Sequence, residues 1–455
     1  WVARMIMMGE YTFHTPPFPE VYLHSLIYGK SYWRKTEGGG IAYVDEKERT
    51  YYDFGKKTPP DDVCSKWEKM SKSKGNIIDP LEVIDEYGTD AIRMALCASA
   101  SQTWEIDLDR RRFAEFKNFA NKIWNGARFV FMNLDEGDPL TAEQFSRGLD
   151  ENLFVLEDRW LLSVLNRTAQ TVNKNLESYN FDQATLDAYD FFWKEFCSYY
   201  VEIAKPTLFG KAGTPEERKN KQKLLVIALC QAIRLIHPMA AFITEELFQR
   251  LKERFSGIQE TSNVDPYTAE AVQALLSPAC IVAPFPKVIR ASDINSNINN
   301  AFCLVGKVVY TIRNIRGEMK IPPGTATEVH IIGSENGDNY QTIQNNSGII
   351  KALVRTEKIA MHAKEPDVGF ASTGIVEDVK IMIPMPEALS KQEISRLEKE
   401  KERLLKQLEK VQTQLANTDF ISKAPENLIE KQKALLAQTE KALKEVDTKL
   451  ELLKK

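Results

Sequence analysis

The sequence predicts a multidomain fold: the end of an α/β (Rossmann-like) domain, an α-helical bundle, a small α+β domain and an antiparallel coiled-coil hairpin. Three observations predict it. The chain has 455 residues, enough for about three domains. Apolar residues recur at three- and four-residue spacing over 152–259, as is typical of amphipathic helices. From Leu389 the composition shifts to Lys, Glu, Gln and Leu with heptad spacing.

Composition excludes several classes of protein. The formal net charge is −4, so any nucleic-acid surface must be a local patch. Six cysteines lie far apart without a CxxC pair, which argues against a disulfide framework and against a cysteine zinc site. We therefore expect no metal site and a reducing, cytoplasmic setting. We find no signal peptide and no apolar run long enough to span a bilayer, and expect no membrane partner.

The first segment, Trp1–Gly9, is apolar, and periodicity does not decide between a helix and a buried strand at this length. After three prolines, residues 20–27 are predicted to form a largely buried strand. His24 lies near its carboxyl end, where ligands gather in parallel sheets, although a lone histidine is more often structural. Because the chain opens on what resembles a domain interior, we expect it to be a fragment.

Residues 28–68 are rich in Gly, Tyr and charged side chains. Alternating apolar residues at 41–44 and 49–54 predict one or two small hairpins carried on a loop.

The octapeptide Lys69–Asn76 combines three lysines, two serines and a glycine. Lysines act as point charges for phosphate oxygens, serines add hydroxyl donors, and Gly75 allows the backbone to bend. Such a segment can close on a nucleotide's phosphates as charge moves in a transition state. For an arbitrary sequence of this composition, the commoner interpretation is a solvated basic loop.

The following elements are mostly helical. Residues 80–87 and 89–96 are predicted helices, the second capped by Thr89 or Asp90, and 113–131 is a long amphipathic helix. Repeated aromatic and aliphatic residues over 152–259 fit a bundle of four or five helices, in which they are most simply core residues. A helix over 298–319 and strands at 328–332 and 379–383 predict the small α+β domain.

The C-terminal segment carries a heptad seam with one lysine in it, formed by Ile394, Leu397, Lys401, Leu404, Leu408, Val411 and Leu415. The pattern breaks at 417–425 and resumes to the end, which predicts an antiparallel hairpin. A dimerisation coil is the alternative. The outer positions carry basic side chains that could follow an RNA backbone: Arg396, Lys399, Arg403, Lys406 and Lys410.

Several motifs carry a family resemblance. Lys69–Ser73 resembles the KMSKS loop of class I aminoacyl-tRNA synthetases, with the usual continuation through Asn76 to Pro80. Trp1–Gly9, together with the later segments 88–93, 235–247 and 313–324, resembles the C-terminal half of bacterial-type valyl-tRNA synthetases. The heptad tail is a pattern associated with that family. The resemblance spans nearly the whole chain.

The resemblance implies a division into five parts. These are the C-terminal part of the catalytic nucleotide-binding domain (1–76, with an insertion at about 28–68), a stem-contact helical region (77–130), an anticodon-binding bundle (131–290), the small α+β domain (291–388) and a tRNA-binding coiled coil (389–455).

The resemblance also implies ATP-dependent formation of valyl-adenylate, followed by transfer of the valyl group to valine tRNA. ATP, bound with Mg²⁺, would be a substrate. Lys69 and Lys72 would be catalytic and would stabilise the triphosphate. Met70 would contact the adenine side, and Ser71 and Ser73 would bond phosphate or order the loop. His24 is a further ATP-binding candidate. Trp1 would form part of the valine pocket.

The sequence departs from the family pattern at several points. It contains no His-Ile-Gly-His motif and no editing domain, so this piece alone is expected to be inactive. Ser25 replaces the usual glycine after the histidine, which weakens a nucleotide role for His24, and 28–68 replaces a short turn. The alternatives are an isoleucyl or leucyl enzyme, or a non-catalytic tRNA-binding module. A monomer is expected.

Overall fold

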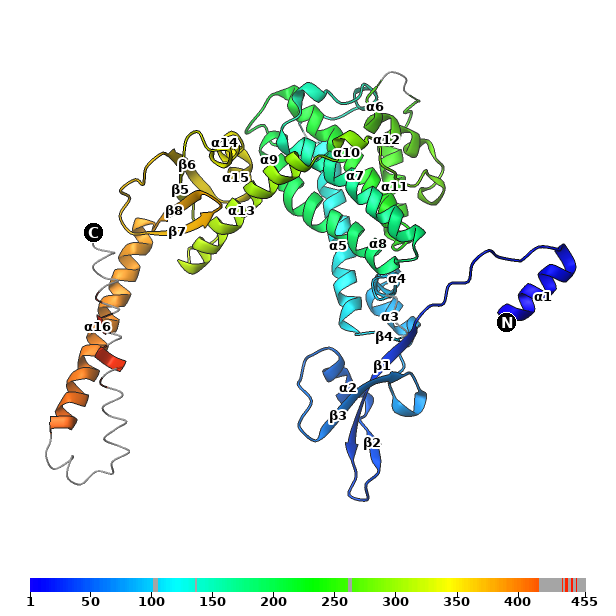
Figure 1. Cartoon of the computed structure of the whole chain (residues 1–455), viewed down its shortest axis with the longest axis horizontal. Coiled ribbons are helices and arrows are strands. Elements are labelled where there is room, and N and C mark those ends of the chain that lie inside the picture. Colours follow the sequence, from blue (N-terminus) through cyan, green and yellow to red (C-terminus); the bar gives the residue numbers. More distant parts are fainter. Residues whose placement is uncertain are drawn as a thin grey trace. The chain divides into compact units, whose positions relative to one another are not determined.

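The structure is a computed structural model that describes residues 1–100, 105–135, 137–260 and 264–416, with residues 436, 438–440, 443, 444 and 447 of the terminal segment. It is mostly helical, with two small mixed sheets (Figure 1). The chain divides into two compact units, Trp1–Ile298 and Asn299–Lys455. No helix within the described residues has the length and apolar character needed to cross a bilayer.

The first segment is helical: α1 spans Val2–Phe13 and none of its residues is buried. The prediction of a buried strand over residues 20–27 is wrong. Strand β1 begins only at Leu26, and Leu23 is 76% exposed. The physical reason is the lack of a neighbour, because no strand in the described chain pairs with residues 20–25 and their apolar side chains have no sheet to pack on.

The first sheet is built around β1 (Leu26–Lys35). It pairs antiparallel with β2 (Ile41–Tyr43) and β3 (Val63–Lys69), and its first residues pair in parallel with β4 (Glu105–Asp107). Residues 28–68 therefore form a folded segment rather than an open loop. Its own small core is made of Tyr32, Val44, Tyr52 and Val63.

The hairpin predicted at 41–44 is confirmed, but the strand-like prediction at 49–54 is wrong. The chain instead forms helix α2 (Glu46–Asp53). Asp45 caps it by accepting a hydrogen bond from the backbone N–H of Glu48 at 3.0 Å. The three-residue spacing of Arg49 and Tyr52 places both side chains on one buried helix face.

The helices predicted after the octapeptide are present as α3 (Pro80–Tyr87), α4 (Thr89–Cys97) and α5 (Arg111–Asp135). The expected cap of α4 is wrong. Gly88, with φ of 91°, precedes the helix, and neither Thr89 nor Asp90 caps it with a side chain. The Asp90 carboxylate instead accepts hydrogen bonds from two backbone N–H groups of α11 (Ala241–Arg254).

The rest of the first unit is a helical bundle around α10 (Pro215–Ile236), which is buried almost continuously from Asn220 onward. Helix α8 (Phe181–Asp190), a π-helical stretch and helix α9 (Val201–Leu208) follow one another without a break and form one continuous helix. Pro206 lies inside that continuous helix and not at its end. The other elements are α6 (Ala142–Ser146), α7 (Leu156–Glu177), α8 (Phe181–Asp190), the π-helical stretch (Phe191–Tyr200), α9 (Val201–Leu208) and α12 (Pro266–Leu276).

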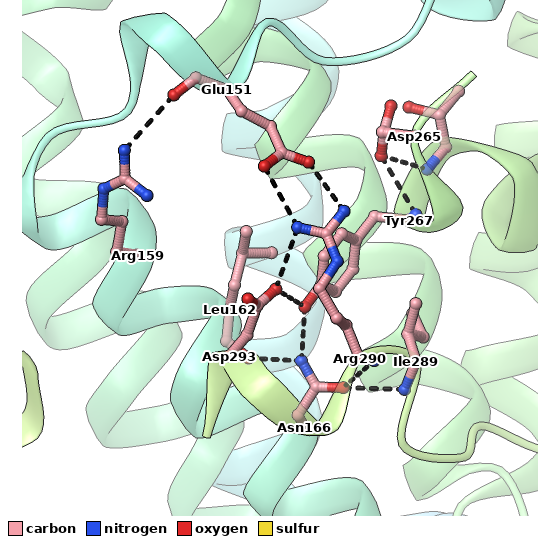
Figure 2. A network of polar contacts seen from close by, with 10 residues as sticks. Glu151, Arg159, Leu162, Asn166, Asp265, Tyr267, Ile289, Arg290 and Asp293 are labelled. Atoms are coloured by element: carbon pink, nitrogen blue, oxygen red, sulfur yellow. Dashed lines mark hydrogen bonds and ion pairs between the residues drawn. The ribbon is translucent and has the colours of Figure 1, made fainter. Parts of the chain in front are cut away.

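A polar network fastens the connection that follows α12 onto the bundle (Figure 2). Arg290 forms a bidentate pair with Glu151, at 2.7 and 3.1 Å. The Asn166 side chain accepts from the backbone N–H of Arg290 at 3.2 Å and donates to the Tyr267 hydroxyl at 2.7 Å. That hydroxyl donates to Asp293 at 2.5 Å. Each of these polar groups has a partner, so the network is a structural clamp.

The second unit holds a four-stranded sheet in the order β6-β5-β8-β7, and its described helices are most of α13, together with α14, α15 and the later α16 (Glu387–Ala416). The strands predicted at 328–332 and 379–383 are confirmed as β5 and β8, whereas β6 and β7 were not predicted. The elements are α13 (Ser296–Glu318), β5 (Thr327–Ile332), α14 (Asp338–Asn345), α15 (Ser347–Leu353), β6 (Thr356–His362), β7 (Ala371–Val376) and β8 (Val379–Pro384).

The heptad segment begins as a single helix, α16 (Glu387–Ala416). Its seam residues Leu397, Leu404 and Val411 are buried, and Leu443 packs against the first two. Lys401, the one charged residue of the seam, pairs with Asp447 at 2.7 Å. Most residues of the predicted second heptad helix lie outside the described part of the chain.

Candidate functional site

The octapeptide Lys69–Asn76 leaves the sheet at the end of β3 and turns sharply. Ser71 is still extended, with φ of −149° and ψ of 138°, and a 3₁₀ turn follows over Lys72–Lys74. Gly75 ends the turn in the left-handed region with φ of 65°, a conformation that favours glycine. The Ser71 and Ser73 hydroxyls lie 3.0 Å apart. The loop therefore has a defined shape in this structure.

Asn76 stabilises this loop conformation through its side chain, which is almost fully buried. The carbonyl oxygen of its side chain, Oδ1, accepts a hydrogen bond from the backbone N–H of Ser71 at 2.8 Å. Its amide donates to the backbone carbonyls of Gly29 and Glu68, at 3.2 and 3.3 Å. A Cβ at position 29 would lie 2.0 Å from the backbone carbonyl oxygen of Asn76, so only glycine fits there. From the sequence, Asn76 is recognisable only as the continuation of the motif.

The three lysines of the loop have different surroundings. Lys74 is paired with Glu68, which raises the pKa of the lysine and lowers that of the carboxyl group. Lys69 and Lys72 are exposed, and neither forms an ion pair with any described residue. Two positive charges at the loop surface are thus available to an anion, while the third is already neutralised.

Two other predicted site residues lie apart from this loop. His24 is exposed and its ring Nδ1 hydrogen-bonds the carbonyl of the adjacent Ser25 at 3.0 Å. Trp1 is 88% exposed, and the Arg4 guanidinium lies over its ring at 4.9 Å. No hydrogen bond or ion pair among the described residues links either side chain to Lys69–Asn76.

The basic residues predicted for RNA lie on α16. Lys399, Arg403, Lys406 and Lys410 are all exposed, and Lys406 pairs with Glu402 at 2.7 Å. The side chain of Arg396 lies outside the described residues. The helix therefore presents solvated cations away from its buried seam, as a surface that follows a phosphate backbone requires.

One group of potential metal ligands occurs within the described residues: His237, Glu245 and Cys280, whose ligand atoms lie within 4.8 Å of one another. Each already makes a protein contact. His237 Nδ1 bonds the Thr244 hydroxyl at 2.7 Å, and Glu245 accepts from the backbone N–H of Cys280. Burial raises the pKa of the Cys280 thiol to about 12, which disfavours the thiolate that binds metals. The His237–Thr244 contact joins the end of α10 to α11, and the Glu245 contacts join α11 to the 3₁₀ turn Cys280–Val282.

Family models match three parts of the chain. The model for tRNA synthetases class I (I, L, M and V) matches residues 63–109, which include the octapeptide loop. The anticodon-binding domain of tRNA ligase matches 158–331. The valyl tRNA synthetase tRNA binding arm matches 391–454.

Curated relatives match nearly the whole chain. The valine–tRNA ligase of Protochlamydia amoebophila is 61% identical over 99% of this chain and 48% of its own length. The valine–tRNA ligase of Chlamydia felis is 41% identical over 99% of this chain and 47% of its own length. The chain thus spans about half the length of the curated relatives it matches. Together with the KMSKS-type loop, these matches show that the chain belongs to the valyl-tRNA synthetase family of class I aminoacyl-tRNA synthetases and corresponds to its C-terminal half.

Proposed function

We propose that the chain is part of an ATP-dependent valine–tRNA ligase that forms valyl-adenylate and charges valine tRNA. The observation that carries the proposal is an ordered KMSKS-type loop with two lysines that have no ion-pair partner among the described residues. The relatives named valine–tRNA ligase and the tRNA-binding family models support it. In this proposal the chain supplies the loop and the tRNA-binding domains, and is inactive without the remainder of the enzyme.

The chemistry expected of the loop is electrostatic. ATP enters with Mg²⁺, and negative charge builds on the leaving pyrophosphate as the valine carboxylate attacks the α-phosphorus. Lys69 and Lys72 would stabilise that charge, with Lys72 on the 3₁₀ turn and Lys69 at the strand end. Ser71 and Ser73 would bond phosphate oxygens or order the loop, and the backbone of Met70 would meet the adenine.

The domain roles follow the five parts predicted from the sequence. The bundle at 131–290 would bind the anticodon arm, the helical region at 77–130 would contact the tRNA stem, and 389–455 would act as a coiled-coil hairpin on the RNA backbone. The contact of Leu443 with the α16 seam and the Lys401–Asp447 pair support an antiparallel return of the chain. Valine tRNA is the expected partner and a monomer the expected state.

His24 and Trp1 remain candidates for ATP and valine binding in the complete enzyme. Both are exposed in this chain, so a neighbouring part of the catalytic domain could use them.

The test compares two lysines of one loop in the full-length enzyme. Lys72→Ala should lower valine-dependent ATP–pyrophosphate exchange by about 100-fold or more, because a free cation at the transition state is lost. Lys74→Ala removes a charge already neutralised by Glu68 and should cost far less. Affinity for valine tRNA should stay nearly unchanged in both. Equal losses of exchange, or a parallel loss of tRNA binding, would contradict the roles given to these lysines.

A further inference from the structure

A cavity of about 360 Å³ lies between the 28–68 insertion, the exit of the octapeptide loop and the turn before α5. Arg49 and Asp53 line it from α2, Trp67 from β3, Asn76 from the loop exit and Arg110 from the turn. None of the individual residues named for ATP, valine or tRNA binding lines this cavity, although part of its lining, Ile78 and residues 108–111, belongs to the stem-contact region 77–130. It therefore needs an explanation of its own.

The charge of the cavity is unbalanced. Five basic side chains line it against two carboxylates, Asp53 and Asp109. Asp109 is already used by Arg111, whose guanidinium donates to it at 2.5, 2.9 and 3.1 Å. Asp53 alone then faces the buried part of the cavity.

Arg49 is the unusual residue of this group. It is 8% exposed, and its buried Nε has no hydrogen-bond partner. Asp53 lies 3.6 Å from Nε of Arg49 and 3.6 Å from Nε of Arg110, too far for a hydrogen bond with either. One carboxylate therefore stands between two guanidinium groups, and a buried donor that costs free energy when left unpaired remains open.

We propose that this cavity is a binding site for a phosphoryl group, held by Arg49 and Arg110. A guanidinium presents two parallel donors that match the oxygens of a phosphate, and burial strengthens such charge-assisted hydrogen bonds. The cavity is larger than a single phosphate. Its aromatic lining residues are Tyr32 and Trp67, and the Lys30 ammonium lies over both rings, 5.4 Å from the centroid of Tyr32 and 5.9 Å from that of Trp67.

The same chemistry has two possible sources: a free phosphate compound such as pyrophosphate, or a phosphodiester of an RNA strand. The site adjoins the octapeptide loop, because Nη1 of Arg49 lies 3.1 Å from where a Cβ of residue 75 would be. The proposal concerns Arg49 of the 28–68 segment and Arg110 of the turn before α5, and does not depend on ligase activity.

Binding to the 455-residue chain is measured by calorimetric titration with inorganic phosphate and with pyrophosphate, in a phosphate-free buffer at low salt. Arg49→Gln should weaken binding about 10- to 100-fold, the usual effect of losing a charge-assisted pair of hydrogen bonds. Lys35→Gln is the matched control, since it removes one positive charge from an exposed position of the same insertion that does not line the cavity. It should leave the affinity unchanged.

Asp53→Asn gives the sharper test, because a misfolded variant could not produce its expected result. Asp53 competes with an incoming anion for both arginines, so its neutralisation should tighten phosphate binding several-fold. The proposal fails if Asp53→Asn weakens binding, or if Arg49→Gln and Lys35→Gln have the same effect. Arg49, Asp53 and Arg110 would then be a closed structural triad that binds no anion.

A valine tRNA transcript distinguishes the two sources. Displacement of bound phosphate by the transcript, with weaker transcript binding by Arg49→Gln, assigns the site to an RNA phosphodiester. Phosphate or pyrophosphate binding that the transcript does not displace assigns it to a free compound. If neither anion binds and Arg49→Gln binds the transcript like the unaltered chain, the proposal is overturned.

Discussion

The Asp90 carboxylate caps a helix other than its own: it accepts the backbone N–H of Ile243 at 2.8 Å, and that of Phe242 at 3.1 Å. These are first-turn N–H groups of α11, which have no partner within their own helix. Three residues further along α4, the Arg93 guanidinium donates to the carbonyl of Pro238 at 2.7 Å. Helix α4 is therefore fastened to the bundle at two polar points.

Asp90→Ala should lower the free energy of unfolding of the first unit by about 1 kcal/mol, since it removes both a cap and a favourable charge at a helix N-terminus. Hydrogen exchange of the α11 first-turn amides should become faster. Asp85→Ala, on exposed α3 surface without a hydrogen bond or ion pair to described residues, is the matched control. Unchanged exchange at Phe242 and Ile243 in Asp90→Ala would contradict the capping role.

Asn76→Ala should loosen the octapeptide loop. The substitution leaves the Ser71 N–H and the Gly29 carbonyl without their partner, at a cost of about 2–3 kcal/mol for a buried site. In the full-length enzyme, ATP–pyrophosphate exchange should fall while affinity for tRNA stays near its original value. Limited proteolysis of the 455-residue chain provides the second readout, with faster cleavage near residue 72. Ser73→Ala, which loses only an exposed hydroxyl contact, should be cleaved like the unaltered chain.

Local patterns predicted the helices of the bundle, the octapeptide loop and the buried α16 seam, because each depends on residues close in sequence. Prediction failed where the deciding partner is distant. Asp90 reads as a local cap, but its partners lie more than 150 positions away. The apolar side chains of residues 20–25 predicted a buried strand. Burial, however, requires a neighbouring strand, and the local pattern does not show whether one is present.

The same reason explains which parts of the candidate sites were missed. The lysines and serines of the loop could be named from the motif alone. Arg49 could not, since its segment alternates like a strand and its pairing with Asp53 and Arg110 depends on a helix and a turn that meet only in the fold. Strands β6 and β7 were missed because polar residues and Gly374 interrupt their apolar alternation.

The stability of the second unit should depend on pH through His330. Burial, and secondarily the charge of His362, lower the pKa of His330, while Glu328 opposes them; the two rings stack with His330 Nδ1 3.0 Å from His362 Nε2. An unfolded histidine titrates near pH 6.5. As the pH falls below about 6.5, the unfolded state binds a proton that the folded state does not, so the free energy of unfolding decreases until the folded pKa is passed.

Nuclear magnetic resonance of the imidazole C–H signals checks this directly, since the chain has only five histidines. His330 should titrate below pH 6.5, and Glu328→Gln should move its midpoint lower still, because that carboxylate favours the charged ring. A His330 midpoint above 6.5, or an upward shift in Glu328→Gln, would contradict the burial argument.

The exposed cations of α16 should set the salt dependence of tRNA binding. Lys399, Arg403 and Lys410 have no ion-pair partner among the described residues, whereas Lys406 is held by Glu402. Replacing the first three with Gln should reduce the slope of log affinity against log salt by about two to three, because each phosphate that the protein no longer neutralises keeps its counterion on binding.

Lys406→Gln is the matched single replacement and should change the slope least, because its charge is already paired within the helix. Sedimentation measurements on the same variants address the alternative role of the coil. If the triple variant keeps its salt slope but changes its oligomeric state, the heptad segment is a dimerisation element. A smaller slope with an unchanged oligomeric state instead places these three side chains along the RNA backbone.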